Sequence, residues 1–254
     1  MKLLHSALLA CGLIAFGATA EASSVTLTGT IRDFSISHPD MQNTVGGVQT
    51  GQVQSILEAN GLPVWQGPAK PGFTTEDNFN QWYSDVPGVN QSKAFELTLT
   101  ETAPGSGILS FSDSYFFPID NQLGGNEGAS HNYYFTLQLA GQFSFMAGQS
   151  FTFTGDDDLW VFFGGKLGID IGGVHPAASR TVTSDDLVAL GLTPGTNYDL
   201  DIFFAERHKT QSNFRIDTSF TVAPPSVVPV PATLPLLLAG IGAVGFVSRR
   251  RRAA

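Results

Sequence analysis

The sequence predicts an all-β protein, an antiparallel β-sandwich with long loops and one or two short helices. Short segments in which apolar and polar residues alternate recur along the chain, separated by turns rich in glycine, proline and asparagine. Phenylalanine is abundant, with 20 residues among 254, and only 14% of the residues are charged. Aromatic residues favour strands, so we expect a single sandwich domain between residues 21 and 222.

The strands are predicted in order along the body of the chain. The first covers Val25–Phe34, where apolar and polar residues alternate, and an irregular stretch follows from residue 38 to residue 91. Residues 159–163 are apolar at every position, as expected for a strand that is buried on both faces. The other predicted strands cover residues 95–99, 108–111, 133–139, 143–145, 151–153, 167–171, 198–204 and 214–220, with a turn predicted at Gly141.

Short helices are predicted in three places. Val53, Ile56 and Leu57 share one helical face, Thr75 can cap a helix that carries Phe79, and residues 185–191 suggest one turn. A long loop is expected from residue 113 to residue 132, and loops of this length in compact domains are usually functional or mobile.

The two ends of the chain have the patterns of targeting segments. Residues 1–20 combine a positive charge, an apolar stretch and the small residues Ala18-Thr19-Ala20, which predicts a secretory signal peptide. Residues 223–231 form a proline-rich linker, and residues 232–254 are predicted to be a hydrophobic helix that ends in arginines. By the positive-inside rule the arginines stay cytoplasmic while the body is exported.

Charge and cysteine content exclude several classes of function. The net charge is −9, and binding of nucleic acid requires a basic surface, so no nucleic-acid partner is expected. The single cysteine, Cys11, lies in the predicted leader, so the mature chain would have no disulfide, thiol nucleophile or thiolate metal site. The acidic balance fits cation binding, and it equally fits a plain soluble exterior.

The predicted functional site is a run of three carboxylates, Asp156, Asp157 and Asp158, between two apolar strands. Adjacent carboxylates repel one another, and the flanking strands hold them in place, so a bound cation would relieve the repulsion. Oxygen ligands on a loop suit a hard ion, above all calcium. The alternative is that these aspartates cap turns by accepting backbone hydrogen bonds.

A second polar cluster follows the strand at residues 198–204. Asn213, Glu206 and His208 are candidate ligand-binding residues there, and Asn213 could add an oxygen ligand. The alternative is that Glu206 and Arg207 form a salt bridge that anchors the loop.

The acidic run also carries a family resemblance. The pattern DD-x-x-W-V-F-x-x-G-K-L-x-I-D over residues 156–170 resembles the signature of PA14-type modules. Together with FFAERHKTQSNFRI at residues 203–216, it resembles the fibro-slime domain of bacteria and slime moulds. The resemblance implies a β-sandwich in which Asp156 and Asp157, joined by a cis peptide bond, coordinate calcium that bridges to sugar hydroxyls. Asp158 stands where PA14 sequences commonly have glycine.

The tail resembles the VPLPA variant of the PEP-CTERM sorting signal, with Val230 in place of leucine. This resemblance implies processing by an exosortase-type membrane enzyme, and the alternative is a simple membrane anchor. The predicted sorting residues are Val228, Pro229, Val230, Pro231, Ala232, Arg249, Arg250, Arg251 and Arg252.

These observations predict a non-catalytic module that is exported across the inner membrane to the cell surface or extracellular matrix. Its expected partners are extracellular polysaccharide or other glycans, bound through a calcium-loaded loop, and the membrane, which the tail holds before processing. One alternative is a structural biofilm matrix protein without a specific ligand. A glycan-active enzyme is disfavoured, because adjacent aspartates on one loop are poorly placed to flank a scissile bond.

Overall fold

The described chain consists almost entirely of antiparallel strands. The structure, a computed structural model, describes residues 21–42, 45–70 and 72–226, and the predicted signal peptide and sorting residues lie outside these ranges. The elements are β1 (Ser24–Phe34), α1 (Glu76–Phe79), β2 (Asn90–Glu101), β3 (Leu109–Asp113), β4 (Phe135–Ser144), β5 (Ser150–Asp156), β6 (Asp158–Phe163), β7 (Lys166–Ile171), β8 (Ala178–Thr183), α2 (Ser184–Ala189), β9 (Tyr198–Glu206), β10 (Asn213–Thr218) and β11 (Thr221–Ala223).

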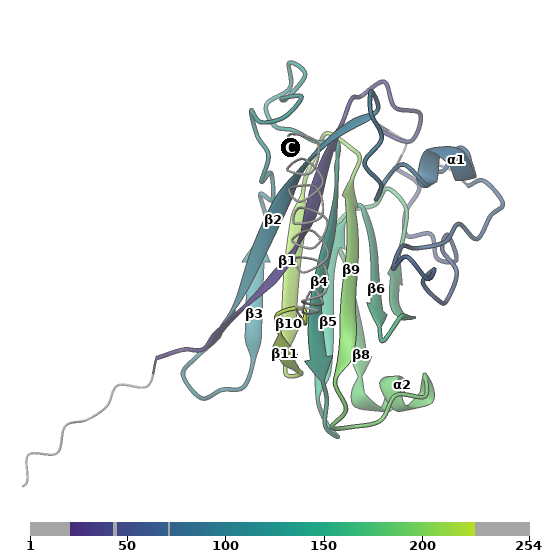
Figure 1. Cartoon of the computed structure of the whole chain (residues 1–254). Coiled ribbons are helices and arrows are strands. Elements are labelled where there is room, and N and C mark those ends of the chain that lie inside the picture. The colour runs from purple at the N-terminus through teal and green to yellow at the C-terminus, as the bar shows by residue number, and fades with distance from the viewer. Residues whose placement is uncertain (1–20, 43–44, 71, 227–254) are drawn as a thin grey trace, which may run out of the picture.

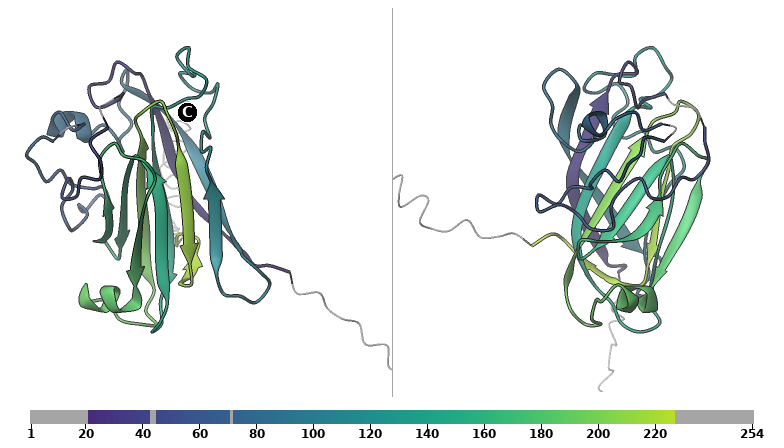
Figure 2. Two further views of the ribbon diagram at one scale, coloured as in Figure 1. Left: turned by 180° about the vertical axis from the view of Figure 1, so that it is seen from behind. Right: turned by 90° about the vertical axis from the view of Figure 1, so that its right-hand side faces the viewer.

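The strands form one continuous hydrogen-bonded ladder that folds over on itself (Figures 1 and 2). The order is β7-β6-β9-β4-β1-β2-β3-β10-β5-β8, and β11 pairs with β4. The two ends of this order, β7 and β8, lie against each other. Gly168 of β7 is so close to β8 that an added Cβ would lie 3.3 Å from a methyl group of Val182. The predicted antiparallel sandwich is therefore confirmed. None of the helices in the described ranges is long and apolar enough to span a bilayer.

The alternation of β9 explains how two hydrophobic layers share one strand. Leu200, Ile202 and Phe204 lie in the main core between the folded halves of the sheet. Phe203 and Ala205 point the other way, into a second apolar cluster. The neighbouring strand β6 is buried at all six positions, as its continuous apolar run predicts.

The second cluster lies beneath the long segment between β1 and β2, which carries α1 and covers the outer face of β6 and β9 (Figure 1). Phe73, Phe79 and Trp82 from this segment pack against Trp160 of β6. The predicted cap of α1 is present, since the Thr75 hydroxyl accepts a hydrogen bond from Asn78 N at 3.1 Å.

Two local predictions are wrong. The helix at Val53–Leu57 is absent, because Val53 and Ile56 form isolated β-bridges with Trp65 and Lys166. Val53 is 3% exposed and Ile56 is 62% exposed, so they do not share a buried helical face. The turn at Gly141 is also absent, because β4 continues through it.

A close approach between strands explains that glycine. A Cβ at Gly141 would lie 2.5 Å from a Leu27 methyl group, so the position requires the absence of a side chain.

Candidate functional site

The three aspartates connect β5 to β6 at the end of the sheet where β9 finishes, which is the upper end in Figure 1. Asp156 is the last residue of β5 and Asp158 is the first of β6. The peptide bond between Asp156 and Asp157 is cis, as the resemblance implied. All three side chains are buried.

Asp156 and Asp157 are held by backbone N–H groups from two other segments. Asp156 accepts hydrogen bonds from Asn213 N at 2.5 Å and Asn213 Nδ2 at 2.9 Å. Asp157 accepts from His175 N at 3.2 Å and from Arg207 N at 3.0 Å. A carboxylate has about four lone-pair positions, so each of these carboxylates can accept further bonds or ligate an ion.

Asp158 has a different environment. Its Oδ1 accepts from Gly173 N at 2.5 Å, and its Oδ2 lies 2.6 Å from both Nε and Nη2 of Arg207. Both side chains of this ion pair are fully buried. The structure thus pairs Arg207 with Asp158 and not with Glu206, and the predicted Glu206–Arg207 salt bridge is wrong.

Arg207 joins the acidic loop to the covering segment. Its guanidinium lies 4.9 Å from the ring centre of Phe73 and 4.7 Å from that of Trp82. Its Nη1 donates to Asp40 O at 2.8 Å and to Gly72 O at 2.6 Å. A buried arginine needs this set of partners, since an unpaired buried charge is strongly destabilising. Asp158 therefore has a structural partner, and a metal site here would depend on Asp156 and Asp157.

The electrostatics of the loop are dominated by burial. Burial raises the pKa of Asp156 and raises that of Asp157 to about 8; the Arg207 charge opposes the latter shift and the Asp158 charge adds to it. Burial, followed by the charges of Asp157 and Asp156, raises the pKa of Glu206 well above its usual value. A divalent cation beside Asp156 and Asp157 would favour their charged forms.

The other predicted ligand-binding residues lie around the same loop. Asn213 contacts Asp156 directly. Glu206 is 1% exposed; its Oε1 accepts from His208 N at 3.2 Å, and its Oε2 has no hydrogen-bond partner in the described chain. The His208 ring contacts the Thr210 hydroxyl at 3.2 Å. The structure therefore brings Asp156, Asp157 and all three of these residues together.

A small pocket of about 50 Å³ lies directly above the cis pair. Asp156 and Asp157 line it together with His175, His208 and Gln211. Within the described ranges, no group of three or more histidine, cysteine, aspartate or glutamate side chains is arranged to hold a metal. The oxygen atoms that could ligate a metal in this pocket are those of two carboxylates, with amide, hydroxyl and backbone oxygens nearby. An all-oxygen set of this kind fits calcium.

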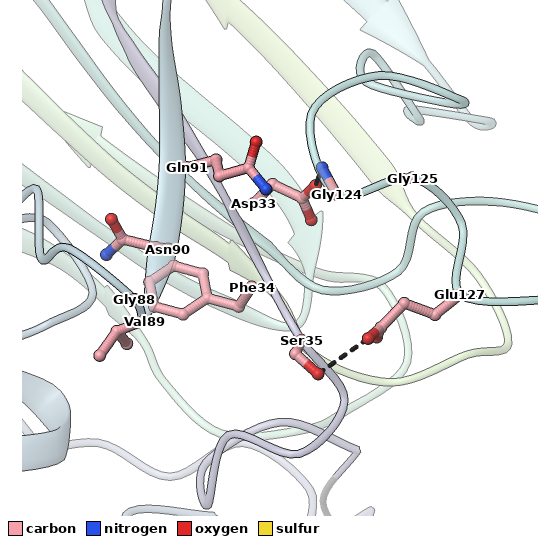
Figure 3. Close-up of a pocket in the computed structure, with 10 residues that line it drawn as sticks. All are labelled: Asp33, Phe34, Ser35, Gly88, Val89, Asn90, Gln91, Gly124, Gly125 and Glu127. Carbon is pink, nitrogen blue, oxygen red and sulfur yellow. Dashed lines mark hydrogen bonds between the residues drawn. The ribbon is translucent and has the colours of Figure 1, made fainter.

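A larger cavity of about 360 Å³ at the same end was not predicted from the sequence. Figure 3 shows it between the ends of β1 and β2 and the β3–β4 loop, with the Gln91 amide directed toward Asp33. Burial raises the pKa of Asp33, whose carboxylate accepts from Gly124 N at 2.7 Å and Asn132 Nδ2 at 2.8 Å. Glu127 similarly accepts from the Ser35 hydroxyl at 2.8 Å. These carboxylates therefore hold the β3–β4 loop on β1.

Two profiles of known families match the chain. Residues 124–229 match the PA14 domain, and residues 227–252 match the PEP-CTERM protein-sorting motif. Both resemblances predicted from the sequence are confirmed. The sorting motif indicates export and surface sorting with a C-terminal tail.

The curated relatives include proteins of the slime mould Dictyostelium discoideum. Protein psiQ is 36% identical over 206 residues, which cover 76% of this chain and 20% of psiQ. Protein psiD is 38% identical over 216 residues, 78% of this chain and 42% of psiD, and protein psiR is 39% identical over 188 residues, 68% of this chain and 19% of psiR. The chain therefore spans less than half the length of these relatives.

The solved structures that match include two PA14 domains. A PA14 sugar-binding domain from an RTX adhesin is 14% identical with a TM-score of 0.28, covering 46% of this chain and 75% of the adhesin domain. The PA14 domain of the antifreeze protein MpAFP is 9% identical with a TM-score of 0.37, covering 85% of this chain and all of that domain.

Proposed function

We propose, from the premise that the chain carries a PA14-like module followed by a PEP-CTERM sorting motif, that it is a non-catalytic surface protein that binds glycans through calcium. One observation carries the proposal. Asp156 and Asp157 face a common pocket while their orientation is fixed by backbone donors from residues 175, 207 and 213. Preorganised carboxylates of this kind lose little conformational entropy when an ion binds.

Calcium would be held by Asp156 and Asp157, with oxygens of the surrounding pocket completing the set. When bound, the ion would neutralise the two carboxylates and offer coordination positions to sugar hydroxyls. The chain's own part is to hold the loop in one orientation, through the buried Asp158–Arg207 ion pair. Asp158 is not assigned to the ion, because its oxygens already accept from Gly173 and Arg207.

The tail supplies the cellular setting of the proposal. An exosortase-type enzyme would recognise the motif at residues 228–232 and process the chain after export. Until then the apolar segment that ends in four arginines would hold the protein in the membrane. The module would then act in the extracellular matrix or at the cell surface.

A glycan array tests this function directly. The purified protein should bind a subset of glycans in millimolar calcium and lose that binding in chelator. The Asp157→Asn variant should fail to bind under both conditions, because it lacks one of the two candidate ligands. Absence of binding by the parent protein in calcium would favour the alternative of a matrix protein without a specific ligand. Release of cleaved sugar during the assay would instead indicate an enzyme.

A further inference from the structure

A separate cavity lies beside the acidic loop, between the β3–β4 loop and the β9–β10 loop. Its volume is about 440 Å³, within the range of ~300–1,000 Å³ typical of small-ligand sites. Aromatic side chains line one part of it, and hydroxyl and amide groups line the rest. The aromatic residues are Tyr115, Phe117, His131 and Tyr133.

The aromatic part of this cavity is held in place by the core. Phe116 is buried against Phe214, with ring centres 4.7 Å apart, and its N–H donates to Ser212 O at 3.0 Å. The residues on either side of Phe116 therefore point outward. Tyr115 N donates to the Asp113 carboxylate at 2.8 Å, and the Tyr115 side chain is 76% exposed. A large aromatic side chain left in water on an anchored backbone is available to a ligand.

Stacked aromatic rings form one wall of the cavity. Phe117 and His131 are parallel, with ring centres 4.1 Å apart and an interplanar angle of 10°. Tyr133 meets Phe117 edge-on at 5.0 Å. The imidazole is oriented by Asp120, whose Oδ2 lies 2.6 Å from His131 Nδ1. Such a surface offers aromatic faces and edges for C–H groups, together with oriented polar atoms for hydroxyl groups.

This cavity lies next to the candidate calcium pocket. Thr210 and Gln211 line both of them. Asn213 lines the larger cavity and donates its side-chain amide to Asp156. A sugar held above Asp156 and Asp157 would therefore have its next residue directed over Thr210 and Gln211 toward Tyr115.

We propose that this cavity is a second sugar subsite, so that the protein recognises an oligosaccharide and not a single terminal sugar. The inference rests on the proposed function, since the first sugar is the one held at the acidic loop. A pyranose has apolar C–H faces and polar edges, which match the aromatic residues and the hydroxyl and amide groups of the cavity. Tyr115 contacts the second sugar, and His131, oriented by Asp120, offers its free ring nitrogen to a hydroxyl.

The test compares saccharides of different length in calorimetric titrations with calcium present. The probes are the methyl glycosides of glucose, mannose and galactose, each beside its homodisaccharide and homotrisaccharide. The parent protein should bind at least one disaccharide about tenfold more tightly than its monosaccharide, which corresponds to ~1.4 kcal/mol. Tyr115→Ala should remove this advantage and leave the monosaccharide affinity unchanged, while Tyr115→Phe, the matched control, should retain most of it.

The outcomes separate the two proposals. If the parent protein binds no probe in calcium, the proposed function fails and the subsite fails with it. If it binds monosaccharides and longer sugars equally, or if Tyr115→Ala weakens both equally or neither, the subsite alone is overturned. The melting temperature of Tyr115→Ala should equal that of the parent, because the side chain is exposed.

Discussion

Asp201 shows, at the scale of a single residue, how burial raises the pKa of carboxyl groups in this protein. It lies in β9, with its side chain on the face opposite Leu200 and Ile202. Burial, with a further contribution from the Asp199 charge, raises its pKa to about 6. The pKa in an unfolded chain is ~3.9. The folded state therefore binds the Asp201 proton more tightly than the unfolded state does. The contribution of this proton to the free energy of unfolding is fully present below pH ~4 and is lost as the pH rises through 6.

Asp201→Asn should consequently stabilise the protein in a pH-dependent way. At pH 7.5 we expect the free energy of unfolding to rise by on the order of 2 kcal/mol, because the buried charge is removed. Near pH 4 the parent carboxyl is already neutral, so the two proteins should be equally stable. Urea unfolding at both pH values measures the difference. Glu96→Gln, at an exposed position of β2, is the control and should show no such dependence.

The acidic loop shows what residue-level sequence reasoning could reach. The cis bond between Asp156 and Asp157 was expected from the family resemblance, and the structure has it. That the three aspartates share one loop follows directly from their adjacency in the sequence. The different environments of the three aspartates were not predicted: Asp158 pairs with Arg207, whereas Asp156 and Asp157 line the pocket. Arg207 lies 49 residues from Asp158, and only the pairing of β6 with β9 brings the two together. A local run of equal charges carries no sign of that partner.

At the scale of elements, the close contact between β1 and β4 depends on a glycine. A Cβ on Gly29 would lie 1.8 Å from Gln138 O and 2.9 Å from Leu139 Cα. These are backbone atoms of the paired strand, which cannot move without breaking the register between β1 and β4. Gly29 therefore permits two central strands to approach each other.

Gly29→Ala should destabilise the protein by roughly 3 kcal/mol or more, since the clash is with backbone and no side chain can rotate to relieve it. Thr30→Ala, at the next position of β1, is the matched control and should cost less than ~1 kcal/mol. Thermal or urea unfolding of both variants gives the comparison. Equal stability of Gly29→Ala and the parent would contradict the observed strand contact.

Strands were predicted best where the alternation of apolar and polar residues, or a run of apolar residues, continued over the whole element. β1, β6 and β9 were predicted from alternation or continuous apolar runs, and all three are present. β8 was not predicted, because Ala178–Thr183 has a mostly exposed surface and little apolar periodicity. The false helix at residues 53–57 arose because its apolar spacing also suits an extended segment whose side chains face different neighbours.

At the scale of the whole molecule, the sandwich places the acidic loop and both loops of the proposed subsite at one end. β1 and β9 both finish there, and the β3–β4 and β5–β6 connections lie at the same end (Figure 1). The antiparallel all-β architecture was predictable from strand spacing. The meeting of β7 with β8, which closes the layers, depends on long-range packing and was not.

Removal of residues 229–254 should change the fate of the protein from surface retention to free secretion. The expected cause is loss of the sorting motif together with the apolar tail. Fractionation of cells and medium, followed by immunoblotting, measures the distribution. Replacing only Pro229 and Pro231 by alanine is the matched control, which should leave an unprocessed, membrane-held chain. An unchanged distribution after truncation would rule out the sorting role.

The most direct test of the central claim is the melting temperature of the exported protein in chelator and in millimolar calcium. If calcium binds only the folded state, a concentration ~100 times its dissociation constant should stabilise the fold by ~2.7 kcal/mol. For a protein of this size we expect a rise of roughly 5–10 °C. Asp157→Asn should lose most of this rise, while Asp201→Asn, which removes a carboxylate elsewhere, should keep it. A parent melting curve that does not move between chelator and calcium would contradict the metal site and the calcium-bridged sugar site together.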